Sequence, residues 1–170
     1  MPNWVANTVV VRGPENEIGR FISKCFHVER CHDDEDNNAD ELELDFEAVI
    51  PIDATVLDAA AGAGDRDTLY RRHWGTKRDA LDTAIIVRRP RYLHFEFITA
   101  SAFPEPVYRE LGRQFPQLEF NIAAIDPGAW WAVTGRIVGD DAVFDENADC
   151  RKVFERVYKQ PFENALQADT

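Results

Sequence analysis

Residues 83–99 read TAIIVRRPRYLHFEFIT, and they contain the clearest strand pattern in the chain. Two runs of β-branched and aromatic residues, TAIIVRR and YLHFEFIT, flank a Pro-Arg pair that suits a tight turn. In the second run Leu93, Phe95 and Phe97 alternate with polar neighbours, which is typical of a strand with one buried face. The stretch therefore predicts an antiparallel hairpin that lays one face on the core.

An amphipathic helix is predicted on each side of this hairpin. Before it, Pro14 suits the first position of a helix whose apolar residues recur at i, i+3, i+4 and i+7. These residues are Ile18, Phe21, Ile22 and Cys25. After it, a second helix is expected to begin at Pro104 or Pro106 and to end at Pro116. Its apolar face carries Val107, Tyr108, Leu111 and Phe115.

Further strands are predicted over residues 4–12, 118–125 and 130–138, each rich in β-branched, aromatic or other apolar residues. The last two are joined by the sequence DPGA, in which proline and glycine favour a tight connection. A last helix is expected from Cys150 to Val157, because its apolar residues have helical spacing.

Two helices bracketed by strands predict an α+β fold with a ferredoxin-like βαββαβ core, an antiparallel sheet with helices packed on one face. The length of 170 residues fits a single domain, residues 1–170. An acidic insertion at about 28–40 and an irregular segment at about 51–82 are expected to interrupt the core, and a C-terminal helix to follow it. Within the irregular segment, residues 59–65 (AAAGAGD) indicate a hinge or loop, and residues 67–73 a short helix.

The charge balance excludes several classes of function. With 31 acidic and 19 basic residues the net charge is −12, so generic DNA binding is disfavoured. No apolar run approaches the roughly 20 residues of a membrane span, and the first residues lack a signal-peptide pattern. Three cysteines fit reduced thiols. We therefore expect a cytoplasmic protein that does not bind membranes.

One basic stretch interrupts this acidic chain. Residues 65–91 contain eight arginines and lysines and four aspartates, a net charge of +4 that leaves −16 elsewhere. Within it, HWGTKR at 73–78 combines an indole, a glycine and hydrogen-bond donors, which can bind an anion. The candidate ligand-binding residues are Trp74, Gly75, Thr76, Lys77 and Arg78, with Arg71 and Arg72 at the rim. The alternative is structural, with Trp74 packed at the sheet edge and Gly75 at positive φ.

The acidic residues suggest a different surface. ELELDFEAVI, residues 41–50, alternates acidic and apolar side chains and predicts a strand with a ladder of carboxylates on its wet face. Such a ladder resembles the charge line of a phosphate backbone. The candidate partner-binding residues are Asp33, Asp34, Glu35, Asp36, Glu41, Glu43, Asp45 and Glu47. The alternative is that these charges only keep the protein soluble.

Four short motifs carry a resemblance to a known family. They are the opening MPNW, the asparagine of VANTVVVRG, the phrase HWGTK, and FEFITA before a proline-containing helix. Together they resemble the YubB-like ferredoxin-like family of phage and plasmid proteins, over residues 1–139. His73 and Arg78 depart from the family pattern of Asn-Trp-Gly-Thr-Lys-Trp, and residues 99–104 (TASAFP) replace Thr-Ala-Trp-Ser-Pro-Pro. The family has no established activity, so the resemblance implies a mobile-element context and no catalytic mechanism.

The sequence offers no set of catalytic residues. CFHVERCH, residues 25–32, holds two thiols and two imidazoles but lacks the paired spacing of a structural zinc site. We expect a non-enzymatic protein without cofactor or metal that binds a basic host protein through its acidic surface. Its most specific form is a DNA mimic that inhibits a nucleic-acid-targeting defence system, of the anti-CRISPR or anti-restriction type. The alternative is a small-ligand or nucleotide-binding module centred on HWGTK. The partner's identity and the oligomeric state do not follow from sequence.

Overall fold

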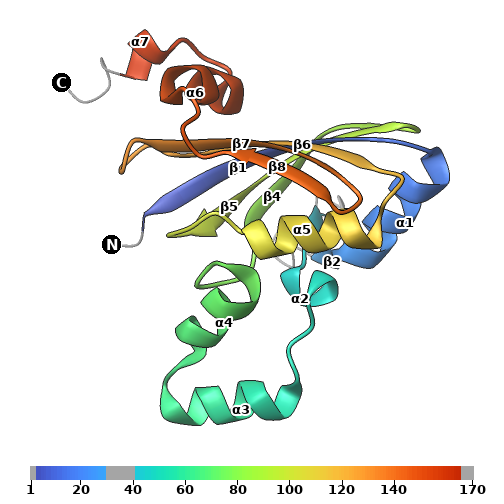
Figure 1. Cartoon of the computed structure of the whole chain (residues 1–170), viewed down its shortest axis with the longest axis vertical. Helices are drawn as coiled ribbons and strands as arrows, with labels where there is room; N and C mark the ends of the chain where they lie inside the picture. Colours follow the sequence, from blue (N-terminus) through green and yellow to red (C-terminus); the bar gives the residue numbers. More distant parts are fainter. Residues whose placement is uncertain (1–2, 30–40, 166–170) are drawn as a thin grey trace, which may run out of the picture.

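A six-stranded antiparallel sheet forms the middle of the molecule (Figure 1). The computed structural model describes residues 3–29 and 41–165. The strands of the sheet are β1 (Trp4–Arg12), β4 (Leu81–Arg89), β5 (Tyr92–Ala100), β6 (Glu119–Asp126), β7 (Trp131–Val138) and β8 (Asp141–Asp145). Their order across the sheet is β4-β5-β1-β6-β7-β8.

The first four strands of that order form the predicted ferredoxin-like core. β1 lies between β5 and β6 and pairs antiparallel with both. The helices α1 (Glu15–Cys25) and α5 (Glu105–Gln114) connect β1 and β5 to the strands that follow them in the core. The α+β prediction is thus confirmed, and β7 and β8 extend the sheet beyond β6.

The main core lies between the sheet and the helices α1 and α5. Leu93, Phe95 and Phe97 are buried on this face, as their alternation predicts. Phe21 of α1 contacts four phenylalanine rings at centroid distances of 5.3 to 6.0 Å. Burying such aromatic side chains is the main stabilising contribution on this face.

The helix α6 (Cys150–Tyr158) packs on the opposite face of the sheet (Figure 1). Its Val153 and Phe154 form a smaller core with residues of β6 and β7. The short helix α7 (Phe162–Ala165) follows it. None of the helices within the described ranges has the length and apolar character of a membrane span.

Two tryptophans follow the turn after β6 and have different environments. Trp131 is half-buried and packs on a small apolar cluster of β1, β6 and β7. Trp130 is 43% exposed, and its ring lies 4.9 Å from that of Phe162.

The prediction of one strand over residues 41–50 is wrong. The chain forms a strand β3 (Glu41–Leu44) and then a helical turn α2 (Phe46–Val49). The turn begins because the Asp45 carboxylate accepts a hydrogen bond from the backbone N–H of Ala48, a typical N-cap. Phe46 and Val49, three residues apart, both enter the core.

The expected boundaries of the insertion and the irregular segment also need correction. β3 pairs with β2 (Phe26–Glu29), so regular structure continues into the insertion expected at 28–40, while residues 30–40 lie outside the described residues. Residues 54–63 form α3 (Ala54–Ala63) instead of a hinge, because five alanines favour a helix and Asp53 caps its first turn. The helix predicted at 67–73 is confirmed as α4 (Arg66–Trp74).

A buried polar network connects β1, β5 and α5. Asn7 is 1% exposed, and its amide donates to the carbonyl of Val5 and to the hydroxyl of Thr99, both at 3.1 Å. The Tyr108 hydroxyl donates to the Asn7 carbonyl oxygen, also at 3.1 Å. Thr99 in turn donates to the carbonyl of Ala102. The asparagine noted in VANTVVVRG therefore has a structural role.

Replacing Asn7 by alanine is expected to lower the free energy of unfolding by about 2 to 3 kcal/mol, because buried polar groups lose their partner. Urea unfolding would measure it. Asn121→Ala is the control, since Asn121 is half-buried and its side-chain amide donates to the Glu119 carboxylate rather than to a buried network. Equal effects of the two substitutions would show that the buried network adds no stability of its own.

Candidate functional site

Trp74 anchors α4 to the body of the protein. Its side chain is only 4% exposed, and its indole N–H donates to the carbonyl of Ile50 at 3.0 Å. The ring stacks on Tyr70 at 4.7 Å and meets Phe46 edge to face. Trp74 is therefore a core residue, and its buried indole, predicted as part of a ligand site, contacts Phe46, Tyr70 and the Ile50 carbonyl.

Gly75 and Thr76 shape the loop that follows α4. Gly75 ends the helix at φ +80°, where a β-carbon would lie 2.9 Å from Pro106 Cδ. Thr76 is fully buried, and its hydroxyl donates to the carbonyl of Arg78 at 2.7 Å. These two residues hold the loop, and Lys77 and Arg78 are the members of HWGTKR that line the adjacent hollow.

Lys77 and Arg78 line a hollow of about 510 Å³, which we call the motif cleft. Its lining residues place it between the first turn of α4, the loop after α4, the start of β1 and the end of β5. Figure 1 shows these elements of the fold. Its other lining residues are Asn3, Trp4, Asp67, Ala100 and Ser101. MPNW, HWGTK and FEFITA are far apart in the sequence, yet each contributes residues to this one cleft.

The cleft offers groups of three kinds to a ligand. The indole of Trp4 is 46% exposed and gives an aromatic surface. Lys77 and Arg78 give positive charge, and Asp67 gives a carboxylate. Ser101 stands at φ +68°, which is unusual for a residue other than glycine, and its N–H donates to the Asn3 carbonyl at 2.7 Å.

The cations at this end of the molecule differ from the other basic residues in their ion pairing. Within the described ranges, no ion pair involves Lys77, Arg78 or the exposed Arg71 and Arg72 of the predicted rim. Other basic residues, by contrast, do form ion pairs with carboxylates. They are Arg20, Arg109, Arg113, Arg136 and Lys159. In a chain of net charge −12, these cations make the surface beside the cleft locally positive.

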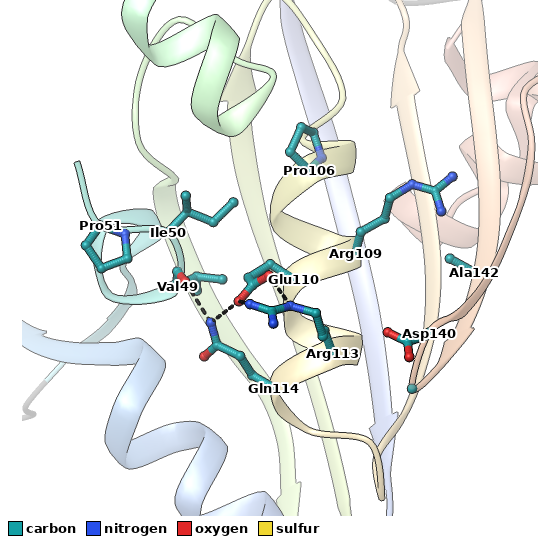
Figure 2. Close-up of a pocket in the computed structure, with 11 residues that line it drawn as sticks. Val49, Ile50, Pro51, Pro106, Arg109, Glu110, Arg113, Gln114, Asp140 and Ala142 are labelled. Carbon is teal, nitrogen blue, oxygen red and sulfur yellow. Dashed lines mark hydrogen bonds and ion pairs between the residues drawn. The ribbon is translucent and has the colours of Figure 1, made fainter. Parts of the chain in front are cut away.

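A second hollow, of about 490 Å³, lies between α5, the end of α2 and the turn after β7 (Figure 2). Here one arginine and one glutamate of the lining pair with each other. Arg113 forms a two-pronged ion pair with Glu110, and the Gln114 amide donates both to Glu110 and to the Val49 carbonyl. The hydrogen bond from Arg113 lowers the pKa of Glu110. This arrangement braces α5 against α2, and we assign it a structural role.

The basic stretch at 65–91 divides into two groups in the structure. Arg88, Arg89 and Arg91 lie at the β4–β5 turn, at the far end of the strands from the motif cleft. The cleft is lined where β5 ends, at Ala100 and Ser101. The two groups are adjacent in the sequence, but β4 runs the length of the sheet between them and places them at opposite ends. A count of charges along the sequence does not show this separation.

The predicted acidic residues do not form one ladder on a strand. Glu41 and Glu43 lie on β3, and the Glu43 carboxylate accepts from the backbone N–H of Thr83 at 3.2 Å. Asp45 caps α2, and Glu47 accepts from the N–H of Ile52 at 2.8 Å. The remaining predicted residues, Asp33, Asp34, Glu35 and Asp36, lie outside the described residues.

Sequence reasoning missed Asn3, Trp4, Asp67 and Ser101 as members of the site. A signal existed for the first two, since MPNW belongs to the resemblance, but it named no role for them. No sequence signal indicated Asp67 or Ser101, because only the packing of α4 beside the ends of the strands brings these residues to the cleft. In the described part of the chain, no group of three or more His, Cys, Asp or Glu residues could hold a metal ion.

The fold has a counterpart among solved structures. The crystal structure of the protein api92 from Yersinia pseudotuberculosis, of the family DUF1281, superposes with a TM-score of 0.61. The match covers 88% of this chain and 99% of that one at 11% identity, so it shows a shared fold. No family model matches the sequence, and no curated protein matches it significantly.

Replacing Gly75 by alanine is expected to lower the free energy of unfolding by about 2 kcal/mol, through strain at positive φ and the contact with Pro106. Thermal and urea unfolding would measure it. Gly19→Ala is the control, because a β-carbon at this α1 position meets nothing within 4 Å. If both variants were as stable as the wild type, the loop would not be held as described.

We expect the free energy of unfolding to depend on pH because of Asp79, which lies directly after the loop. Burial raises its pKa to about 6, although its carboxylate accepts from the N–H groups of Phe46 and Ala80. An unfolded aspartate titrates near 3.9, so the folded state binds the proton more tightly. The protonated Asp79 therefore adds to the free energy of unfolding below about pH 4, and this contribution is lost as the pH rises through about 6.

The variant Asp79→Asn should lack this loss, because an amide can accept the same hydrogen bonds without charge. We expect the stability difference, wild type minus variant, to fall by up to about 3 kcal/mol between pH 4 and pH 7. Urea unfolding at several pH values measures the difference. A difference that stayed flat, or rose with pH, would contradict the raised pKa.

Proposed function

We propose that the protein is a non-enzymatic binding module that takes a nucleotide or a similar phosphorylated molecule in the motif cleft. The single observation that supports this most strongly is the pair of cations Lys77 and Arg78, in the cleft where three separate motifs meet. Among residues 3–29 and 41–165 neither has an ion-pair partner. Phosphate groups suit such donors, and the exposed indole of Trp4 offers a surface for a planar base.

The shape of the site supports binding without chemistry. Lys77 lies at the cleft wall on a loop held by Thr76, and the carboxylate of Asp67 faces the same hollow. A binding site needs this combination of a concave surface, an apolar face and a few placed polar groups. No nucleophile with an adjacent base is involved in the proposal, which requires only recognition.

An acidic surface that binds a basic host protein, as a DNA mimic, remains a hypothesis. Its support is the net charge of −12 and the exposed carboxylate of Glu41. The strand expected to align the carboxylates ends at Leu44. The carboxylates of Asp45 and Glu47 accept hydrogen bonds from backbone N–H groups of the protein itself. The motif cleft is therefore the better supported candidate.

We infer further that the chain is a divergent member of the YubB-like ferredoxin-like family. The inference rests on MPNW, HWGTK and FEFITA and on the likeness of the fold to the DUF1281 protein of Yersinia. A phage or plasmid context follows from that membership, and we propose a cytoplasmic location. The motifs' common position at the cleft is the reason to seek the family's ligand there.

A thermal-shift series over nucleotides and inorganic phosphate tests the proposal. A ligand at about 100 times its Kd stabilises by about 2.7 kcal/mol, which raises the Tm of a chain of this size by several degrees. Lys77→Ala should abolish the shift while the Tm without ligand stays near that of the wild type. Lys152→Ala on α6 is the matched control. A shift of the same size in Lys77→Ala would place the ligand elsewhere, and no shift with any nucleotide would refute the proposal.

A further inference from the structure

The unpaired cations continue beyond the motif cleft along α4. Arg71 and Arg72 lie on the exposed side of the helix, away from Tyr70 and Trp74, and in the described part of the chain neither forms an ion pair. Asp67 is the only carboxylate of this helix. A patch of this kind attracts a polyanion more strongly than a single phosphate does.

The helix is too long for a single nucleotide to use all of it. Its nine residues extend over about 13 Å, while successive nucleotides of a stacked strand rise by about 3.4 Å. α3 and α4 also project from the side of the molecule that carries α2 and α5 (Figure 1). No residue of α3 is buried, so this arm is open to a long ligand.

The groups in the cleft favour a single strand over a duplex. Trp4 is exposed and can stack on a base, and the Asp67 carboxylate repels phosphates but accepts hydrogen bonds from the N–H groups of bases. A duplex presents phosphates outward and keeps its bases stacked inside. The charge of −16 outside residues 65–91 further restricts the contact to a short, flexible polyanion.

We propose that the ligand is a single-stranded oligonucleotide that stacks a base on Trp4, places phosphates on Lys77 and Arg78, and continues along the arginines of α4. This inference rests on the proposed function, because it extends the same cleft. It adds the class of ligand and the direction in which the strand leaves the cleft.

Fluorescence anisotropy with labelled ten-nucleotide DNA and RNA strands tests it, beside the matched duplexes and competition by mononucleotides. Single strands should bind at least tenfold more tightly than a mononucleotide. Their affinity should fall with salt by about 0.7 logarithmic units per neutralised phosphate, a slope near −3 for four contacts. Comparing the DNA and RNA arms then shows whether the 2′-hydroxyl is read.

The double variant Arg71→Glu, Arg72→Glu separates this inference from the proposed function. Neither arginine lines the motif cleft. The variant should therefore weaken oligonucleotide binding at least tenfold and mononucleotide binding less than threefold, whereas Lys77→Ala should weaken both. The double variant Arg151→Glu, Lys152→Glu on α6 makes the same change in net charge and should have a much smaller effect. Circular dichroism confirms that each variant is folded.

Three results would overturn the inference and leave the proposed function standing. They are equal affinity for mononucleotide and oligonucleotide, equal affinity for single strand and duplex, and an α4 double variant no weaker than the α6 control. Binding of neither nucleotides nor oligonucleotides would refute both proposals together.

Discussion

The structure depends on the central position of β1. This strand pairs with β5 on one side and β6 on the other, so it joins the two halves of the ferredoxin-like core. Asn7 adds a directional constraint, because its amide reaches Thr99 of β5 while its carbonyl oxygen receives Tyr108 of α5. A buried amide tolerates few arrangements of its partners. The network thereby fixes the ends of β1 and β5 that line the motif cleft.

The motif cleft is built from side chains with separate tasks. Trp74, Gly75 and Thr76 hold the loop, while Lys77, Arg78 and Trp4 face the hollow. This division explains why a motif of adjacent residues cannot be taken as a site as a whole. Its buried members give the exposed ones a fixed position, and preorganised donors lose less entropy on binding.

The sequence predicts the elements whose periodicity is unambiguous. The strands at 4–12 and 83–99 and the apolar faces of α1, α5 and α6 agree with the structure, since each has one clearly apolar face. Residues 41–50 mislead, because Phe46 and Val49 have helical spacing within an alternating pattern. The hydrogen bond from the Ala48 N–H to the Asp45 carboxylate favours the helical turn over a continued strand. A prediction from strand propensity does not take such a cap into account.

The site is less predictable for a different reason. HWGTKR contains the loop that lines the motif cleft, but the burial of Trp74 and the position of Lys77 at the cleft depend on distant elements. Trp4 and Ser101 join the site only because β1 and β5 end side by side, with Ser101 bonded to Asn3. Such convergence is a property of the topology, and no local window of sequence contains it.

The weak attachment of the α3–α4 arm has an energetic consequence. α3 buries no residue and α4 buries only Trp74, so the arm can detach in a local opening that costs much less than global unfolding. Amide hydrogens of the arm would then exchange with solvent well before those of β1. A molecule that contacts both Trp4 and the loop after α4 would bind only when the arm is packed against the body of the protein. Its binding would therefore lower the population of the locally opened state.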